Sequence, residues 1–242
     1  IALGWFHQIP TGNELVLDQV ASGWWTSLYV LTLVLLVAYR VAMPALNAWR
    51  FRLRVAEVVE EGPGVVSVRI EGRNLHRLRA RGGQFLLWRF LQKGFALESH
   101  PFSLSAAPDG RSLRITAKDL GDFTGRLARL RPGTPVLAEG PFGVFTAETC
   151  TTGKALLIGG GIGVAPVRAL AEELDGPATL LYRVVDESEA IFRDELRELA
   201  EQRGVEVHLV AGDHRSERGR TLLTAQHLRE LVPDVAERDV YV

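Results

Sequence analysis

The sequence predicts a membrane helix followed by an antiparallel β-barrel domain and an α/β domain with a doubly wound parallel sheet. Three observations support this prediction. Residues 24–46 are almost wholly apolar, residues 50–147 hold short apolar runs separated by turn residues, and residues 153–242 alternate between strand-like and helix-like segments. We therefore expect a membrane segment at residues 1–48 and domains at residues 49–150 and 151–242.

Composition excludes several classes of protein. The chain has 242 residues and a net charge of −1, so no basic excess points to nucleic acid as a partner. Cys150 is the only cysteine, which excludes an internal disulfide and a cysteine-ligated iron–sulfur cluster within this chain. Because the chain starts at Ile1 and its last residues read as a strand, we expect a piece of a longer protein.

The apolar run is long enough to cross a membrane. From Trp24 to Tyr39 there is no charged residue, and Arg40 alone interrupts the apolar sequence before Leu46. A helix needs about 20 residues to cross about 30 Å of hydrocarbon. Tryptophan and tyrosine near the two ends match an interfacial aromatic belt. The alternatives are a buried helix of a soluble protein and a signal peptide, although no basic region precedes the run.

Charge predicts the orientation of this span. Lys and Arg are absent before Arg40, whereas Arg50, Arg52 and Arg54 follow the span closely. The positive-inside rule therefore places the residues after 46 in the cytoplasm.

Residues 1–9 read as the end of an earlier span, and residues 10–13 as the start of a short outer loop. His7 is the only ionisable residue in that tail. An intramembrane histidine is a candidate haem ligand or proton-relay group, and the alternative is an interfacial histidine that only hydrogen-bonds a neighbour.

Short apolar runs and turn residues predict the antiparallel domain. Six such runs read as strands, which suggests a small barrel, and a short helix is expected at residues 125–130. The predicted strands are residues 52–59, 65–70, 84–90, 102–105, 113–117 and 135–138.

The first candidate site of this domain is His100-Pro101-Phe102-Ser103, which puts an aromatic ring and a hydroxyl at neighbouring strand positions. An isoalloxazine ring needs a flat face to stack on and a hydrogen bond at its redox-active edge. Taken alone, the same residues could be an ordinary strand kinked by proline.

The second candidate site is the segment from Lys118 through Gly121 to Thr124. It offers a glycine for close backbone approach, a hydroxyl, a positive charge and the amides of a helix start, which together suit a phosphate group. We add Thr116, on the preceding strand, to the candidates. The structural alternative is a helix N-cap at Thr124. Both sites together predict a flavin nucleotide, FAD.

Alternating strands and helices predict the parallel sheet of the second domain. The predicted strands are residues 154–158, 178–184, 205–210 and 239–242, and the predicted helices are residues 166–174, 189–203 and 224–231.

A glycine run lies between the first of these strands and its helix. Such a run can hold a dinucleotide pyrophosphate on backbone N–H groups, although a glycine-rich turn can also be purely structural. We expect Pro166 at the first helical position. The candidate residues are Gly160, Gly161, Ile162, Gly163, Val164 and Pro166.

Basic residues follow the next two strands of this domain. Arg183 ends the second strand, and Arg215 follows the third, flanked by His214 and Arg218. A guanidinium near the adenosine ribose could hold a 2′-phosphate, which favours NADPH and leaves NADH possible. The alternative is that these loop arginines are simply solvated.

On these residues the chain resembles the C-terminal part of membrane flavocytochromes of the ferric reductase and NADPH oxidase type. Their cytoplasmic module is similar to ferredoxin–NADP⁺ reductase. The matching segments are residues 83–85, 100–103, 121–124, 140–143 and 161–164 with Pro166. The resemblance implies that His7 is a ligand of haem b.

The sequence therefore leads us to expect a membrane-bound oxidoreductase that moves electrons from NADPH through FAD and haem to ferric iron or dioxygen. The alternatives are a tethered flavin reductase without haem and a non-enzymatic, flavin-binding, redox-sensing subunit. We expect a multi-pass protein of the cell membrane with both domains cytoplasmic. Its partners would be a small-molecule acceptor and membrane lipid, and the sequence identifies no protein partner.

Overall fold

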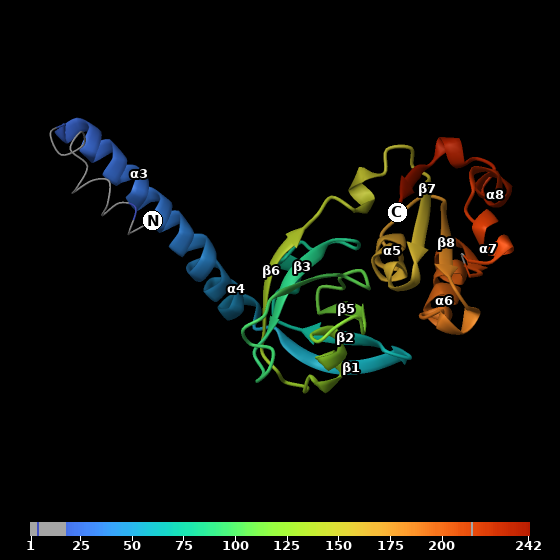
Figure 1. Ribbon diagram of the computed structural model, residues 1–242, viewed down its shortest axis with the longest axis horizontal. Coiled ribbons are helices and arrows are strands. Elements are labelled where there is room, and N and C mark those ends of the chain that lie inside the picture. The colour runs from blue at the N-terminus through green and yellow to red at the C-terminus, as the bar shows by residue number, and fades with distance from the viewer. Residues whose placement is uncertain (1–3, 5–17, 214) are drawn as a thin grey trace. The chain divides into compact units, whose positions relative to one another are not determined.

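The computed structural model describes residue 4 and residues 18–213 and 215–242 (Figure 1). It divides into two compact units, Ile1–Trp49 and Arg50–Val242, which are described separately below. The predicted haem ligand His7 lies outside the described residues, as do the start of the outer loop and, apart from Gly4, the predicted end of an earlier span.

The apolar run forms one continuous helix, made of α3 (Gln19–Val37), a π-helical turn (Ala38–Ala42) and α4 (Met43–Phe51). The Asp18 carboxylate caps it, because Oδ1 accepts from the N–H groups of Val20 (2.9 Å) and Ala21 (3.1 Å). The π-helical turn ends two residues before Pro44. Proline lacks an N–H, and its ring clashes with the carbonyl four residues earlier, here that of Arg40 within the turn.

This helix is longer than the predicted span at both ends. Residues Gln19–Phe51 number 33, with a mean hydropathy of 1.9 in the most apolar window, and α3 contains no buried residue. Among the described residues it is the one helix with the length and composition to cross a membrane.

We call the part of the chain that follows this helix the antiparallel domain. It consists of two three-stranded sheets. Their strand orders are β1-β2-β5 and β4-β3-β6, and every pairing is antiparallel. The strands are β1 (Arg54–Gly62), β2 (Val65–Glu71), β3 (Phe85–Phe90), β4 (His100–Ser103), β5 (Ser112–Lys118) and β6 (Val136–Phe142).

The predicted barrel is therefore only partly formed. Single bridges, Arg54↔Pro135 and Leu104↔Ile115, join the two sheets at their corners in place of continuous ladders. Proline has no N–H to donate to a strand ladder. Pairing between the sheets therefore stops at one bridge beside Pro135. For the same reason β4, which contains Pro101, is short. The predicted short helix is a 3₁₀ helix at Thr124–Arg129.

Alternating burial fixes the face of each strand in this domain. On β3, Leu86, Trp88 and Phe90 are fully buried, and their neighbours are half-exposed. Leu113 and Ile115 of β5 pack into the same core. Residues Arg114, Thr116 and Lys118 consequently lie on the opposite face of β5.

We call the last part of the chain the parallel-sheet domain, and it has the predicted α/β fold. Its sheet has the order β10-β7-β8-β9 and every pairing is parallel. The strands are β7 (Ala155–Gly160), β8 (Ala178–Val184), β9 (Glu206–Ala211) and β10 (Asp239–Tyr241), and the helices are α5 (Val164–Ala171), α6 (Arg193–Arg203), α7 (Glu217–Thr221) and α8 (Ala225–Leu231).

Successive strand residues serve two cores, one on each face of this sheet. Leu157 and Leu180 belong to the core that includes residues of α5 and α6, whereas Leu156 and Leu181 face the core that includes residues of α8. This is the arrangement expected of a doubly wound sheet. Helix α6 starts at Arg193, later than predicted, because Phe192 adopts a left-handed conformation (φ 59°). Helix α7 was not predicted.

Candidate functional site

The two predicted flavin segments meet around an aromatic cluster. The whole segment His100–Ser103 lies on β4, which begins two residues earlier than predicted. The His100 ring is 3.8 Å from the ring of Phe123, centroid to centroid, and the Phe102 ring lies 6.1 Å from it, nearly parallel at 22°. Phe123 belongs to the second segment, so the fold brings it beside two residues that are 23 and 21 positions earlier in the sequence.

Charged groups surround this cluster. Arg126 Nη2 donates to Glu98 Oε1 (3.1 Å), and His100 Nε2 lies 3.3 Å from Glu98 Oε2. These contacts, that with Arg126 first, hold the pKa of the Glu98 carboxyl below its usual value. Arg126 Nε also donates to the Asp122 carbonyl (2.7 Å), so one guanidinium joins the loop before β4 to the turn that carries Phe123.

The Thr124 hydroxyl organises the turn between Lys118 and Gly125. It accepts from the Leu120 N–H (3.0 Å) and donates to the Gly121 carbonyl (3.2 Å). A Cβ on Gly121 would meet no atom within 4 Å, so a ligand can approach the backbone there. A cavity of about 320 Å³ adjoins Thr124 and Gly125. The open backbone of this turn fits a phosphate group, whereas the Lys118 ammonium lies 3.8 Å from Glu189 Oε2 of the following domain.

The other candidates of this domain lie in different surroundings. Pro101 is exposed, and Ser103 is half-buried opposite Phe85 of β3. Thr116 is buried, and its hydroxyl lies 2.7 Å from both Ser67 Oγ and Ser105 Oγ. The hydroxyl is thus enclosed in a buried hydrogen-bond chain, and the role of Thr116 in the flavin site stays a prediction.

The glycine run forms an open turn at the carboxyl end of β7. The 3₁₀ turn Gly161–Gly163 precedes α5, and Gly161 has a φ of +53°. A Cβ at Gly160, Gly161 or Gly163 would meet no atom within 4 Å, whereas one at Gly159 would come within 2.8 Å of Val164 Cα. The backbone is thus accessible to a pyrophosphate, and Gly159 is required by close packing.

Three further residues of this run have separate positions. Val164 is fully buried and Ile162 packs against the same core. Pro166 is the third residue of α5, and the prediction that it is the first was wrong. The tight turn makes the helix start earlier, and position three still needs no intrahelical N–H donor.

Arg183 and Arg215 lie near the carboxyl ends of the strands, as the glycine turn does, but in different environments. Strand pairing aligns Gly160 with Arg183, and Arg183 with Val210. The Arg183 guanidinium donates to the carbonyls of Val184, Val210 and Gly212. Arg215 is exposed, and its N–H donates to Asp213 Oδ1 (2.8 Å). His214 and the Arg218 side chain are outside the described part of the chain.

Helix α5 also contacts the antiparallel domain, a feature that the sequence did not reveal. The Gly82 backbone lies so close to α5 that a Cβ there would be 2.1 Å from the Ala169 carbonyl oxygen. The neighbouring residue Arg168 donates from Nη1 to the Ser105 carbonyl (3.0 Å). The helix that follows the glycine turn is therefore packed directly on the domain that holds the aromatic cluster.

A partly buried charge cluster strengthens this contact. The Glu195 carboxylate of α6 accepts two hydrogen bonds from the Arg114 guanidinium of β5 (2.8 and 2.9 Å). It also lies 2.7 Å from Arg168 Nη2. Burial raises the pKa of Glu195, but the Arg114 hydrogen bond and the charge of Arg168 outweigh it, so the net pKa is lowered. Burial also lowers the pKa of the Arg168 guanidinium. The two arginines share one carboxylate across the domain boundary.

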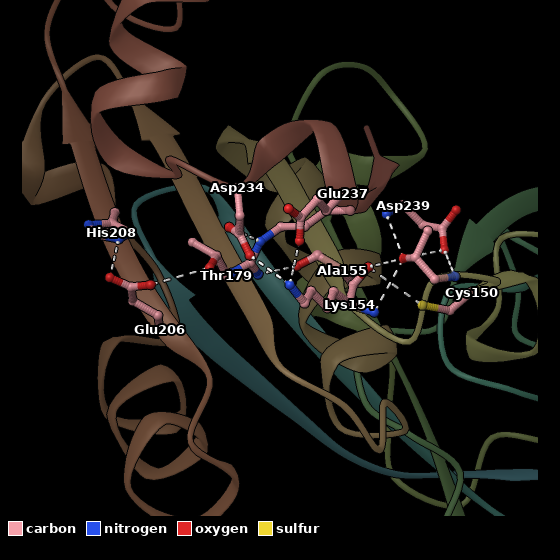
Figure 2. Close-up of polar contacts among 11 residues, drawn as sticks. Cys150, Lys154, Ala155, Thr179, Glu206, His208, Asp234, Glu237 and Asp239 are labelled. Carbon is pink, nitrogen blue, oxygen red and sulfur yellow. Dashed lines mark hydrogen bonds and ion pairs between the residues drawn. The ribbon is translucent and has the colours of Figure 1, made fainter.

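A second polar network lies at the opposite, amino-terminal ends of the strands (Figure 2). Lys154 Nζ lies 3.3 Å from Asp234 and 2.8 Å from Glu237. The Asp239 carboxylate accepts from the N–H groups of Thr151 (2.6 Å) and Thr152 (2.7 Å). These hydrogen bonds lower the pKa of Asp239 to about 2, and those from Thr152 contribute more than those from Thr151. This network anchors β10 and is remote from the glycine turn.

No group of three or more histidine, cysteine, aspartate or glutamate side chains suited to a metal occurs among residues 18–213 and 215–242.

Comparison with known proteins shows what these features are similar to. Residues 50–146 match the model of an FAD-binding domain. The chain is 35% identical over 107 residues to ferredoxin–NADP reductase B of Sorangium cellulosum, covering 41% of this chain and 44% of that protein. It is 30% identical over 108 residues to NADPH oxidase 1 of Mus musculus, covering 40% and 18%. The chain thus spans less than half of either relative.

Solved structures share the fold at lower sequence identity. The flavohem-like FAD/NAD-binding domain of the Vibrio cholerae nitric oxide dioxygenase has a TM-score of 0.58 at 21% identity, and the match covers 78% of this chain and 98% of that one. Ferredoxin–NADP⁺ reductase of Plasmodium falciparum has a TM-score of 0.61 at 13% identity, covering 78% and 83%.

Residues 50–146 of this chain are therefore similar to an FAD-binding domain, and the chain shares its fold with solved structures of an FAD/NAD-binding domain and a ferredoxin–NADP⁺ reductase.

Proposed function

We propose that this chain is part of a membrane-bound oxidoreductase that moves electrons from NADPH through FAD and haem to an acceptor such as ferric iron or dioxygen. Residues 49–150 would hold FAD and residues 151–242 would hold the nicotinamide coenzyme. When bound, FAD exchanges electron pairs with the coenzyme and single electrons with haem.

One observation carries the proposal. An aromatic and cationic cluster suited to a flavin and an open glycine turn suited to a pyrophosphate lie in one compact unit, with α5 packed on Gly82 and Ser105. Two cofactors can react only if their domains hold them together, and this packing supplies a fixed connection between the two domains.

Residues of the antiparallel domain would bind and orient FAD. The Phe102 ring offers a stacking face, and the Ser103 hydroxyl a hydrogen bond to the flavin edge. Lys118 and the backbone around Gly121 would bind phosphate oxygens, while Thr124 holds that turn in shape.

Residues of the parallel-sheet domain would bind the coenzyme. The amides of Gly160–Gly163 would receive the pyrophosphate. Arg215 is the described guanidinium best placed for a 2′-phosphate, because Arg183 already donates to three backbone carbonyls. We therefore favour NADPH over NADH.

The membrane part of the proposal rests on the helix Gln19–Phe51 and on the similarity to an NADPH oxidase. We propose that both domains are cytoplasmic, that the protein spans the membrane more than once, and that His7 ligates haem b. A small molecule would accept the electrons, and lipid would surround the span.

Spectroscopy of the full-length protein, purified in mild detergent, tests these statements together. We expect a flavin absorption band, NADPH oxidation with an artificial acceptor, and a haem Soret band that shifts on reduction by NADPH. Flavin and NADPH oxidation without a Soret band would indicate a tethered flavin reductase. Flavin without NADPH oxidation would indicate a redox-sensing subunit, and failure to retain FAD would overturn the proposal.

A further inference from the structure

Exposed basic side chains gather where α4 leads into the antiparallel domain. We call this group the basic collar. All its members are exposed and they come from separate parts of the sequence: Arg50, Arg52, Arg54, Arg73, Lys93 and Arg131.

Hydrogen bonds bring two of these segments beside the end of α4. The Arg73 N–H donates to the carbonyl of Phe51, the last residue of α4 (2.6 Å). Arg54 Nη1 donates to the Gly133 carbonyl (2.9 Å), and the Gly133 N–H donates to the Val55 carbonyl (2.7 Å). The turns that carry Arg73 and Arg131 are therefore fixed next to residues 50–54.

The loop that carries Lys93 joins the same region. Gln92 Nε2 donates to the Arg129 carbonyl (3.0 Å), and the Arg131 N–H donates to Gln92 Oε1 (3.0 Å). The Leu91 N–H donates to the Pro135 carbonyl (2.8 Å). The collar is thus a product of the fold, because three of its six members are distant from residues 50–54 in sequence.

Acidic residues are absent from these segments. Residues 50–54, 72–77, 89–97 and 129–133 contain no Asp or Glu, although the whole chain has a net charge of −1. The nearest acid in the strand ladder is Glu71 opposite Arg54, and it lies 3.9 Å from Arg69. These four segments therefore carry a net positive charge.

Chain connectivity places the collar close to the end of the apolar run. The run ends at Leu46, and Arg50 follows four residues later in the same helix. At about 1.5 Å per helical residue this is a rise of roughly 6 Å, less than the Debye length of about 8 Å at physiological salt. The covalent link alone therefore keeps Arg50 near the end of the apolar run.

We propose that the basic collar docks the antiparallel domain onto anionic phospholipid headgroups. The proposal rests on the membrane placement given under Proposed function. Clustered guanidinium and ammonium groups beside a span attract anionic lipid, and their contributions add within a Debye length. Docking at several points would restrict rotation of the domain about residues 50–54 and hold the flavin site at a constant height from the bilayer.

A fluorescent label tests the docking in the intact membrane protein. Leu97 is 94% exposed and lies in the loop that carries Lys93, so an environment-sensitive dye on Leu97→Cys, with Cys150→Ser, reports on this surface. The protein is placed in nanodiscs of phosphatidylcholine alone or with added phosphatidylserine. We expect a blue-shifted emission only with phosphatidylserine, and its reversal as NaCl is raised.

Two triple variants distinguish an effect of the basic collar from an effect of the protein's total charge. Replacing Arg52, Arg73 and Arg131 by glutamine should lower the docking constant by on the order of 100-fold and abolish the shift. Replacing Arg197, Arg203 and Arg229, exposed arginines of the parallel-sheet domain, by glutamine removes the same charge and should leave the shift unchanged.

The outcomes decide between distinct conclusions. Equal spectra in both lipids, or loss of the shift in both triple variants, would overturn the proposal. A shift produced by soluble inorganic phosphate in neutral nanodiscs would also overturn it, since the collar would then bind a free phosphate. FAD content and NADPH oxidation, measured on the same samples, report separately on the proposed function.

Discussion

At the scale of single residues, the aromatic cluster carries the flavin site. His100 and Phe102 share one face of β4 and both pack on Phe123, so a single ring sits beside both. The Trp88 indole N–H donates to the Phe102 carbonyl (3.1 Å) and holds that position of the strand. The face offered to a flavin is therefore fixed before any ligand binds.

Phe102→Ala should weaken FAD binding at least about fivefold, because stacking on an aromatic ring contributes roughly 1 kcal/mol beyond area burial. Fluorescence titration of the apoprotein with FAD measures this change. Leu97→Ala, which truncates an exposed side chain, should leave the affinity unaltered. Equal affinities of the Phe102 variant and the wild type would mean that the flavin stacks elsewhere.

Arg215→Ala should raise the KM for NADPH on the order of tenfold and leave the KM for NADH unchanged, because a charge-assisted hydrogen bond to the 2′-phosphate would be lost. Steady-state kinetics with both coenzymes measure the ratio. Arg229→Ala on α8 is the matched control. A parallel rise in both KM values would exclude a contact specific to the 2′-phosphate.

At the scale of elements, α5 connects the two halves of the site. Its first turn follows the glycine turn, and near its end Arg168 and Ala169 contact Ser105 and Gly82 of the antiparallel domain. The Arg114–Glu195 pair binds β5 to α6 nearby. A shift of this helix would move the coenzyme loop relative to the flavin site.

Gly82→Ala should slow flavin reduction by NADPH on the order of 100-fold, as expected when reacting groups are misplaced by about 1 Å. The added Cβ would be 2.1 Å from the Ala169 carbonyl oxygen, so the helix must move. Anaerobic stopped-flow absorbance measures the rate, and the FAD content should be retained. Gly23→Ala, where a Cβ meets nothing within 4 Å, is the control. Unchanged rates in the Gly82 variant would show that the domain contact does not set the reaction geometry.

At the scale of the whole molecule, the network of Figure 2 ties the last strand to the start of the parallel-sheet domain. Asp239 bonds the loop before β7, and Lys154 bonds the segment before β10 through Asp234 and Glu237. Because Asp239 has its pKa lowered from 3.8 to about 2, its contribution to stability is present above pH 4 and is lost as pH falls toward 2.

Asp239→Asn should therefore lower the thermal unfolding temperature at pH 7 and have progressively less effect between about pH 4 and pH 2, where the wild-type carboxylate becomes protonated. Circular dichroism of the detergent-solubilised protein measures this. Asp175→Asn, at an exposed loop position, should show no such pH-dependent difference. A difference in unfolding temperature between Asp239→Asn and wild type that stays constant down to pH 2 would contradict the lowered pKa of Asp239.

Local pattern was sufficient for much of the fold. The apolar run, the alternation on β3 and the buried strands of the parallel domain each follow from side-chain periodicity, and they occur within a few residues of the predicted bounds. The failures have local causes: the left-handed Phe192 delays α6, the tight glycine turn advances α5, and proline at the sheet corner leaves the barrel open.

The order of the parts and the classes of the two domains could be predicted from the sequence, because periodicity, glycine and proline act over a few neighbouring residues. The flavin and phosphate segments were also proposed from it and stay predictions. Only the tertiary structure decided which of these segments touch. It buried Thr116, used Arg183 in backbone contacts, packed α5 on Gly82 and gathered the basic collar. Such contacts depend on chain segments far apart in sequence, whose positions are set by packing and not by local pattern.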